Sequence, residues 1–230
     1  NYLIDTDNAI IVDVEASRAI RQAEVGAART MIERIWDRFA LKPKRLAADT
    51  AYGTAEMLGW LVKRKNIAPH IPVFDRAQRE DGTLSRSDFE WLPDHNLYLC
   101  PNGKVLRATG RIHDGRTRYY RSSKTDCDPC TLKARCCPKA PHRRIPRDID
   151  EDARDVARAI QDTPAYEQSR KDRKKVEMLF AHLKRILKIN RLRLRGPKGA
   201  RDEFLLAATV QNLRKLARLR PEPAPQAMPA

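Results

Sequence analysis

The sequence predicts an α/β fold, a mixed sheet with flanking helices that is interrupted by a cysteine-bearing, loop-rich insertion. Three observations carry this prediction. Strand and helix patterns alternate over residues 1–74, as in α/β domains. Apolar periodicity fades over 75–147, where all the cysteines lie, and helical periodicity returns over 148–219. The proline-rich end, 220–230, is predicted to be a disordered tail.

The first part opens with a predicted hairpin. Two strand-like segments flank a polar turn at 6–8, and the second of them, 10–14, is rich in β-branched residues. Apolar side chains then recur at helical spacing over 18–39, where they share one face. Pro43 is predicted to end this helix.

Asp49 closes the next predicted strand, which covers 44–49. In open α/β sheets, functional sites are built where strands end. A second helix is predicted over 54–66 with Thr54 as its N-cap, followed by a short edge strand over 67–73 that contains two prolines. Asp49 is therefore a candidate site residue.

The insertion contains two strand candidates, 96–100 and 117–121, and an odd number of cysteines, which argues against a disulfide framework. The five are Cys100, Cys127, Cys130, Cys136 and Cys137. The first three with either of the last two would supply four thiolates, a set that suits a structural Zn²⁺. Because a zinc ribbon has a pair where this chain has one cysteine, reduced thiols in a small basic domain are the alternative.

Three helices are predicted after the insertion. The first, over 150–162, has acids in its first turn, where they complement the helix dipole. The second, over 163–189, starts with Thr163 as N-cap and Pro164 at the first helical position. The third, over 200–219, follows a Gly-Pro break and has a strong apolar face.

The charge distribution points to a polyanionic partner. The formal net charge is +16, and residues 170–201 hold 13 Lys or Arg against 2 acids. A run of this length and sign favours binding to a nucleic acid backbone over a merely solvated helix. The sequence has no apolar run of about 18 residues, so no membrane partner is expected and the protein is predicted to be cytoplasmic.

One carboxylate, Glu177, interrupts the basic helix. At about 100° per residue it falls on a stripe with basic side chains, whereas the apolar residues share another face. The basic members of the stripe are Arg170, Arg173, Lys184 and Lys188. A local ion pair between Arg173 and Glu177, worth about 0.3–0.5 kcal/mol, is the simpler explanation. An acid that holds a divalent cation against phosphate, with Asp49 as its companion, is the functional one.

Two segments resemble known proteins. "LAADTAYG" around Asp49 is similar to the second-acid strand and turn of insertion-sequence DDE transposases. "RKKVEMLFAHLK" resembles their third-acid motif, Tyr-x2-Arg-x3-Glu-x6-Lys, with matches at Arg173, Glu177 and Lys184. The motif's tyrosine is replaced by Arg170. The resemblance covers nearly the whole chain and is to the C-terminal catalytic portion of these enzymes, which have an RNase H-like core.

The resemblance implies a function in DNA transposition. Asp49 and Glu177 would hold Mg²⁺ or Mn²⁺ ions for hydrolysis of a phosphodiester at the element's end and for strand transfer. Arg173 and Lys184 would hold phosphates, with Arg170 and Lys188 as further DNA-binding candidates. The implied partners are double-stranded DNA, at element ends and at the target, and further copies of the chain in a homodimer or higher synaptic assembly at the bacterial nucleoid.

The family's first aspartate lies on a strand before the hairpin, and this chain begins at the hairpin. We therefore expect a fragment that lacks the first catalytic aspartate and the N-terminal DNA-binding region, and that is inactive alone. Asp5 and Asp13 are the nearby acids, and hairpin carboxylates are usually solvated turn groups. The alternatives are an inactive transposase remnant that only binds DNA, and an RNA-binding zinc-ribbon protein in which Asp49 and Glu177 have no role.

Overall fold

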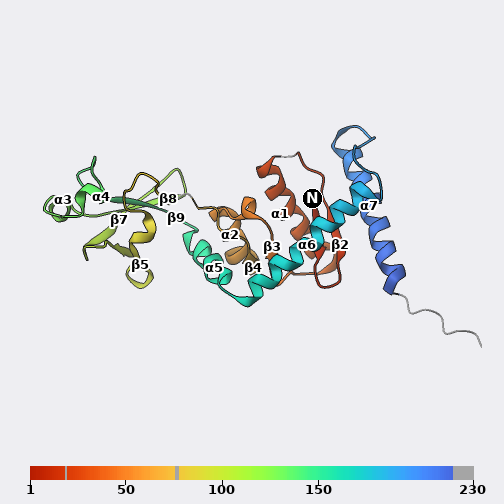
Figure 1. Cartoon of the computed structure of the whole chain (residues 1–230), viewed down its shortest axis with the longest axis horizontal. Coiled ribbons are helices and arrows are strands. Elements are labelled where there is room, and N and C mark those ends of the chain that lie inside the picture. The colour runs from red at the N-terminus through yellow and green to blue at the C-terminus, as the bar shows by residue number, and fades with distance from the viewer. Residues whose placement is uncertain (19, 76–77, 220–230) are drawn as a thin grey trace, which may run out of the picture. The chain divides into compact units, whose positions relative to one another are not determined.

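The computed structural model describes residues 1–18, 20–75 and 78–219, so the predicted tail lies outside the described residues (Figure 1). It is a mixed α/β structure, which confirms the predicted fold class. The chain forms two compact units. Unit 1 contains residues 1–51 and the described residues from 160 onward, and unit 2 contains residues 52–159. The predicted division of the chain at 75 and 147, and the RNase H-like arrangement, stay predictions.

Unit 1 begins with the predicted hairpin. Strand β1 (Tyr2–Asp5) pairs antiparallel with β2 (Ile10–Val14) around the polar turn. Helix α1 (Arg21–Phe39) follows. It ends at Phe39, the predicted last residue, and the C-cap is Ala40, which adopts a left-handed conformation (φ 52°) and whose N–H donates to the carbonyl of Trp36 at 2.9 Å.

Most of the predicted apolar face of α1 is buried. The buried members are Ala28, Met31, Ile32 and Ile35. Ile20 and Trp36 are about half exposed instead, at 52% and 53%. Ile20 is the N-cap residue of the helix, so it lies at the edge of the packed face.

Two long helices complete unit 1 together with the short strand β3 (Arg45–Ala47). Helix α6 (Pro164–Arg185) starts as predicted, since the Thr163 side chain accepts a hydrogen bond from the N–H of Tyr166. Helix α7 (Gly196–Leu219) begins at the glycine and proline that were predicted to precede it. A proline in the first turn costs nothing, because that turn's N–H groups have no partner within the helix.

The hairpin is fixed from both sides in unit 1. The ring of Tyr2 stacks on Phe180 of α6 with a centroid distance of 4.7 Å. On α7, the side-chain amide of Asn212 donates to the carbonyl of Ile11 (2.8 Å) and accepts from its N–H (2.9 Å), as a neighbouring strand would. Asn212 thus satisfies both backbone groups of Ile11 on β2 with its side chain.

Unit 2 contains a five-stranded antiparallel sheet in the order β5-β6-β7-β8-β9. The strands are β5 (Glu90–Leu92), β6 (Leu97–Leu99), β7 (Val105–His113), β8 (Thr117–Arg121) and β9 (Arg144–Asp148). The two strand candidates of the insertion correspond to β6 and β8. The insertion is therefore a strand meander, with more regular structure than the loop-rich segment that was predicted.

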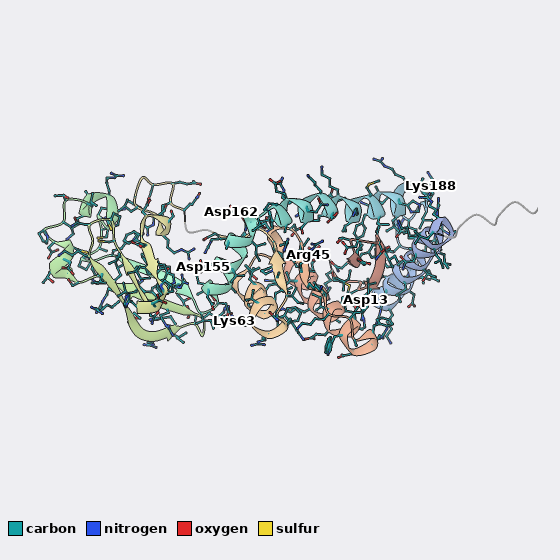
Figure 2. The ribbon with its side chains drawn as sticks, turned by 90° about the horizontal axis from the view of Figure 1, so that it is seen from below. Asp13, Arg45, Lys63, Asp155, Asp162 and Lys188 are labelled. Carbon is teal, nitrogen blue, oxygen red and sulfur yellow. The ribbon has the colours of Figure 1, made fainter. Side chains whose placement is uncertain are left out.

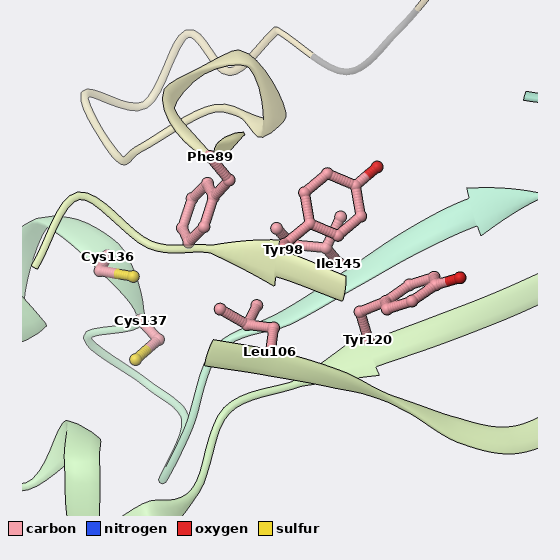
Figure 3. Packing of buried hydrophobic residues seen from close by; sticks show 7 residues of the cluster. All are labelled: Phe89, Tyr98, Leu106, Tyr120, Cys136, Cys137 and Ile145. Atoms are coloured by element: carbon pink, nitrogen blue, oxygen red, sulfur yellow. The ribbon is translucent and has the colours of Figure 1, made fainter. Parts of the chain in front are cut away.

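One face of this sheet carries the core of unit 2 (Figure 3). Its buried members are Phe89, Tyr98, Leu106, Tyr120, Cys136, Cys137 and Ile145. The two cysteines come from α4 (Lys133–Cys136) and the residue after it, close to the short helix α3 (Lys124–Cys127) in sequence. Three of the core side chains, Leu106, Tyr120 and Ile145, come from adjacent strands, so the sheet buries one face and leaves the other open.

The remaining elements of unit 2 are helical except for β4 (Ala68–His70). Helix α2 (Ala55–Gly59) starts at Thr54, whose side chain accepts from the N–H of Met57 as predicted, and continues as a π-helix over Trp60–Lys65. Helix α5 (Glu151–Gln161) has acids in its first turn. Within the described residues, no helix is long and apolar enough to cross a membrane.

Candidate functional site

The helix that carries Glu177 lies against the strand end that carries Asp49. The Arg173 guanidinium on α6 donates to the carbonyl of Ala48, the residue before Asp49, at 3.2 Å. Next to Arg173 on the helix, the carboxylate of Asp172 lies 4.0 Å from the guanidinium of Arg45 on β3. Both candidate acids therefore belong to unit 1, and a hydrogen bond ties their two elements together.

Asp49 is exposed and held by its own turn. One carboxylate oxygen accepts from the N–H of Ala51 at 2.8 Å, a short side chain to backbone bond that is typical of Asx turns. Its second oxygen has no hydrogen bond to any described residue. The carboxylate is therefore oriented and still open to a ligand.

Glu177 is exposed and makes no ion pair or hydrogen bond within the described part of the chain. The predicted local pair with Arg173 is absent there, because Arg173 turns to the carbonyl of Ala48 instead. A tertiary contact has replaced the helix contact that would have explained the acid. No ion pair or hydrogen bond with a described residue therefore explains why an acid stands at position 177 of the basic helix.

Of the other residues predicted to bind DNA, two lie on α6 and one lies beyond its end. Arg170 and Lys184 lie on the helix with exposed side chains. Lys188 lies beyond the helix, which ends at Arg185, and its backbone is left-handed with φ 56° (Figure 2). The predicted helical stripe therefore stops at Lys184, and the DNA-binding roles stay predictions.

Asp172 is a residue that the sequence did not single out. It is buried on α6, where it accepts hydrogen bonds from Lys175 (2.9 Å) and Gln168 (3.1 Å). The Lys175 bond is the largest cause of its lowered pKa, because it favours the ionised carboxylate. Lys175 also donates to the carbonyl of Thr6 at 2.8 Å. Asp172 thus helps to position α6, and the only sequence signal was an acid inside a basic run.

The two hairpin acids have structural partners. Asp5 accepts from the N–H of Asp7 (3.0 Å) and the side chain of Asn8 (2.7 Å), and the Asn8 bond is the main cause of its lowered pKa. Asp13 pairs with Arg34 of α1 at 2.8 Å. These contacts account for both carboxylates without a catalytic role.

The acids fit a hard cation held jointly with substrate. Within the described ranges, no group of three or more His, Cys, Asp or Glu side chains is arranged to hold a metal ion. Mg²⁺ is commonly bound by one or two carboxylates, with waters and substrate phosphates as the other ligands. Asp49 and Glu177 are both exposed and have carboxylate oxygens that accept no hydrogen bond within the described residues, so they supply donors of this chemical type. Their role as metal ligands stays a prediction.

The cysteines gather around one small pocket of unit 2, although they come from separate segments. All five are unpaired thiols. The sulfur of Cys100 accepts from the N–H of Lys104 at 3.3 Å, and the Ser122 hydroxyl lies 3.0 Å from the sulfur of Cys127. Burial raises the pKa of Cys136 to about 12 and also raises that of Cys137.

Comparison with known proteins identifies the family of this chain. A family model described as a transposase DDE domain matches residues 99–217, slightly more than half of the chain. The matched segment includes Glu177 and ends before α7 does, whereas Asp49 lies outside it. Neither the curated proteins nor the solved structures gave a match. The chain therefore belongs to the transposase DDE domain family, which supports a role in DNA transposition.

Proposed function

We propose that this chain is the catalytic portion of a DDE transposase that cleaves a phosphodiester at the ends of an insertion element and transfers the strand to target DNA. The observation that carries the proposal is the hydrogen bond from Arg173 to Ala48, because it brings the Glu177 helix to the strand end of Asp49. Duplex DNA is the substrate, two or more copies assemble on it, and the cytoplasmic nucleoid is where they would meet it.

Asp49 and Glu177 would hold the Mg²⁺ or Mn²⁺ that this chemistry requires. When bound, such an ion lowers the pKa of the attacking water and offsets charge on the leaving oxygen. The chain's own residues do the positioning. Lys184, two turns after Glu177 and exposed, is placed to hold a phosphate, and Arg170 is exposed on the same helix. Arg173 holds the strand end in place through Ala48.

A remnant that binds DNA without cleaving it is the second candidate. It is favoured by the carboxylates, since among the described residues no group of three or more His, Cys, Asp or Glu side chains is arranged to hold a metal ion. The purified chain should be incubated with labelled duplex that carries an element end, in Mg²⁺ and separately in Mn²⁺. Robust cleavage supports the enzyme and contradicts the expectation that the chain is inactive alone. If the chain binds DNA without cleaving it, Mn²⁺ binding that is weakened by Glu177→Gln supports the enzyme, and Mn²⁺ binding that does not depend on Glu177 supports the remnant.

We propose in addition that the cysteine cluster holds one structural Zn²⁺. The support is that all five thiols line one pocket and that Cys100 accepts a backbone N–H. No three of the described side chains are arranged for a metal ion, so zinc would have to draw its four thiolates together on binding. Reduced protein should contain about one zinc per chain by elemental analysis. Cys127→Ser and Cys130→Ser should lose it and lower the unfolding temperature.

The adjacent pair provides the internal control for this prediction. Cys136→Ser and Cys137→Ser should differ, because a fourth ligand is needed from one of them and the other is a core side chain. The variant that keeps its zinc identifies the core residue. Reduced wild-type protein without zinc would leave the five cysteines as packed thiols.

A further inference from the structure

The open face of the unit 2 sheet carries three arginines in one row. Arg107 on β7 lies directly opposite Arg121 on β8, and Arg121 lies directly opposite Arg144 on β9. Residues directly opposite each other on paired strands point to the same face. All three side chains are exposed, and none has an ion pair or side-chain hydrogen bond to a described residue.

The row lies on the face away from the core. The neighbours of the three arginines in sequence are the inward residues Leu106, Tyr120 and Ile145 (Figure 3). Successive side chains of a strand alternate between faces, so the arginines point outward. Packing of the core therefore does not explain why arginine stands at these positions.

Three like charges side by side are unfavourable in a free sheet. Cross-strand pairs of opposite charge stabilise a sheet, whereas like charges directly opposite destabilise it. Neighbouring strands are about 4.8 Å apart, so the row spans about 10 Å. A line of phosphates offers negative charges at comparable spacing and would compensate all three guanidinium groups.

The surroundings of the row favour an anionic ligand too. The Arg144 guanidinium lies 4.3 Å from the centre of the Tyr119 ring, which holds it along the face. Two strand carboxylates share this face. Glu90 lies on β5, two strands away from β7, and Asp148 is paired with Arg116 at 2.8 Å. Neither is placed beside the row.

We propose that this arginine row (Arg107, Arg121 and Arg144) binds the phosphate backbone of DNA and is a contact surface separate from the Asp49 and Glu177 site. The inference rests on the proposed function for the identity of the polyanion. The contact is made to phosphates, so it adds affinity and orientation without reading sequence. In this arrangement unit 2 contributes to holding DNA while the acids of unit 1 act on it.

The test replaces each arginine of the row by glutamine, which removes the charge and keeps a polar side chain. The full chain with Arg107→Gln, Arg121→Gln and Arg144→Gln is titrated against labelled duplex DNA at several salt concentrations. Each phosphate contact contributes about 0.9 to the slope of log K against log salt, so the slope should become less steep by up to about 2.7. The triple Arg→Lys variant should keep most of the slope, because its charge is unchanged.

A matched control removes the same charge from unit 2 away from the row. Lys124, Arg135 and Lys139 are exposed and lie outside the strands. Their triple Gln variant should change the slope much less. An equal change in both triple Gln variants would show that only net charge matters and would overturn the proposal. A lower unfolding temperature of the triple Gln variant of the arginine row would also overturn the proposal, because removing like charges should leave the fold equally or more stable.

The outcomes also separate this surface from the proposed catalytic function. Row-dependent binding to duplex DNA without cleavage supports the surface and agrees with a chain that is inactive alone, and Mn²⁺ binding that does not depend on Glu177 would overturn the proposed function but leave the surface standing. Cleavage and binding that are both unchanged by the row substitutions overturn the surface alone. Tighter row-dependent binding to duplex RNA of the same sequence would overturn DNA as the partner.

Discussion

Glu177→Gln should abolish strand cleavage while duplex DNA binding stays the same or becomes tighter. A catalytic metal contributes several kcal/mol of transition-state stabilisation, so a loss of about a thousandfold or more is expected. Binding should not weaken, because the substitution removes a negative charge from a surface that faces phosphates. Cleavage is measured on labelled duplex with an element end in Mg²⁺ or Mn²⁺.

Glu177→Gln should leave the stability of the fold nearly unchanged. Glu177 is exposed and unpaired among the described residues, and glutamine has nearly its shape. The free energy of unfolding should therefore change by less than about 0.5 kcal/mol. Asp49→Asn should behave in the same way, because asparagine keeps the oxygen that accepts from the N–H of Ala51.

Glu167 offers a matched control on the same helix. It is an exposed acid in the first turn of α6, away from the Arg173 contact. Glu167→Gln should leave cleavage and Mn²⁺ binding unchanged. If the chain shows no cleavage of its own, calorimetric titration of Mn²⁺ in the presence of duplex gives the readout, and Glu177→Gln should weaken it. Loss of cleavage that merely tracks a lower unfolding temperature would make Glu177 a structural residue.

Local patterns predicted the elements of unit 1 and the starts of α2 and α6, whereas α7 begins at the Gly-Pro pair that was predicted to precede it. Thr54 and Thr163 cap their helices as expected, because an N-cap depends on residues within one turn. The end of α1 at Phe39 was predicted, but its left-handed C-cap at Ala40 was not. A left-handed alanine gives no sequence signal, so the helix end was attributed to Pro43, four residues beyond Phe39.

The sheet of unit 2 was harder to predict. Strands β5 and β6 are three residues long, too short for alternation to stand out. Strand β8 was predicted as a strand candidate, whereas β9, with Arg144 and Pro146 at outward positions, has the composition of a basic loop. Inward and outward side chains do alternate along both strands, with Tyr120 and Ile145 inward. Which face is buried can be recognised only once the pairing of the strands is known.

The candidate acids were identified from sequence, but their relation was not. Asp49 and Glu177 were singled out by strand end and by charge pattern. The contact that links their elements, from Arg173 to Ala48, joins residues 125 apart in the chain. Local rules favoured a pair between Arg173 and Glu177, and tertiary structure overrode that preference. The gathering of the cysteines is likewise a property of the fold.

Glu151→Gln should destabilise unit 2 more than any surface substitution. Its side chain is 1% exposed and contacts the guanidinium groups of Arg86, Arg154 and Arg158 at 2.9, 3.0 and 2.9 Å. Removing one partner of a buried ion pair leaves uncompensated charge and typically costs about 3–5 kcal/mol. The three arginines keep some access to water, so we expect about 3 kcal/mol. Urea unfolding followed by circular dichroism and tryptophan fluorescence measures it.

Asp152 on the same helix provides the control, because it carries the same charge as Glu151 but is exposed. It is 63% exposed and pairs with Lys63 at 2.8 Å. Asp152→Asn removes the same charge from α5, and an exposed pair contributes less than about 1 kcal/mol. Asp75 also contacts Arg86 and Arg158, at 2.7 and 2.6 Å, and could compensate for the lost carboxylate. If Glu151→Gln costs no more than Asp152→Asn, then Asp75 and solvent suffice for the arginines, and the buried charge does not hold α5 in place.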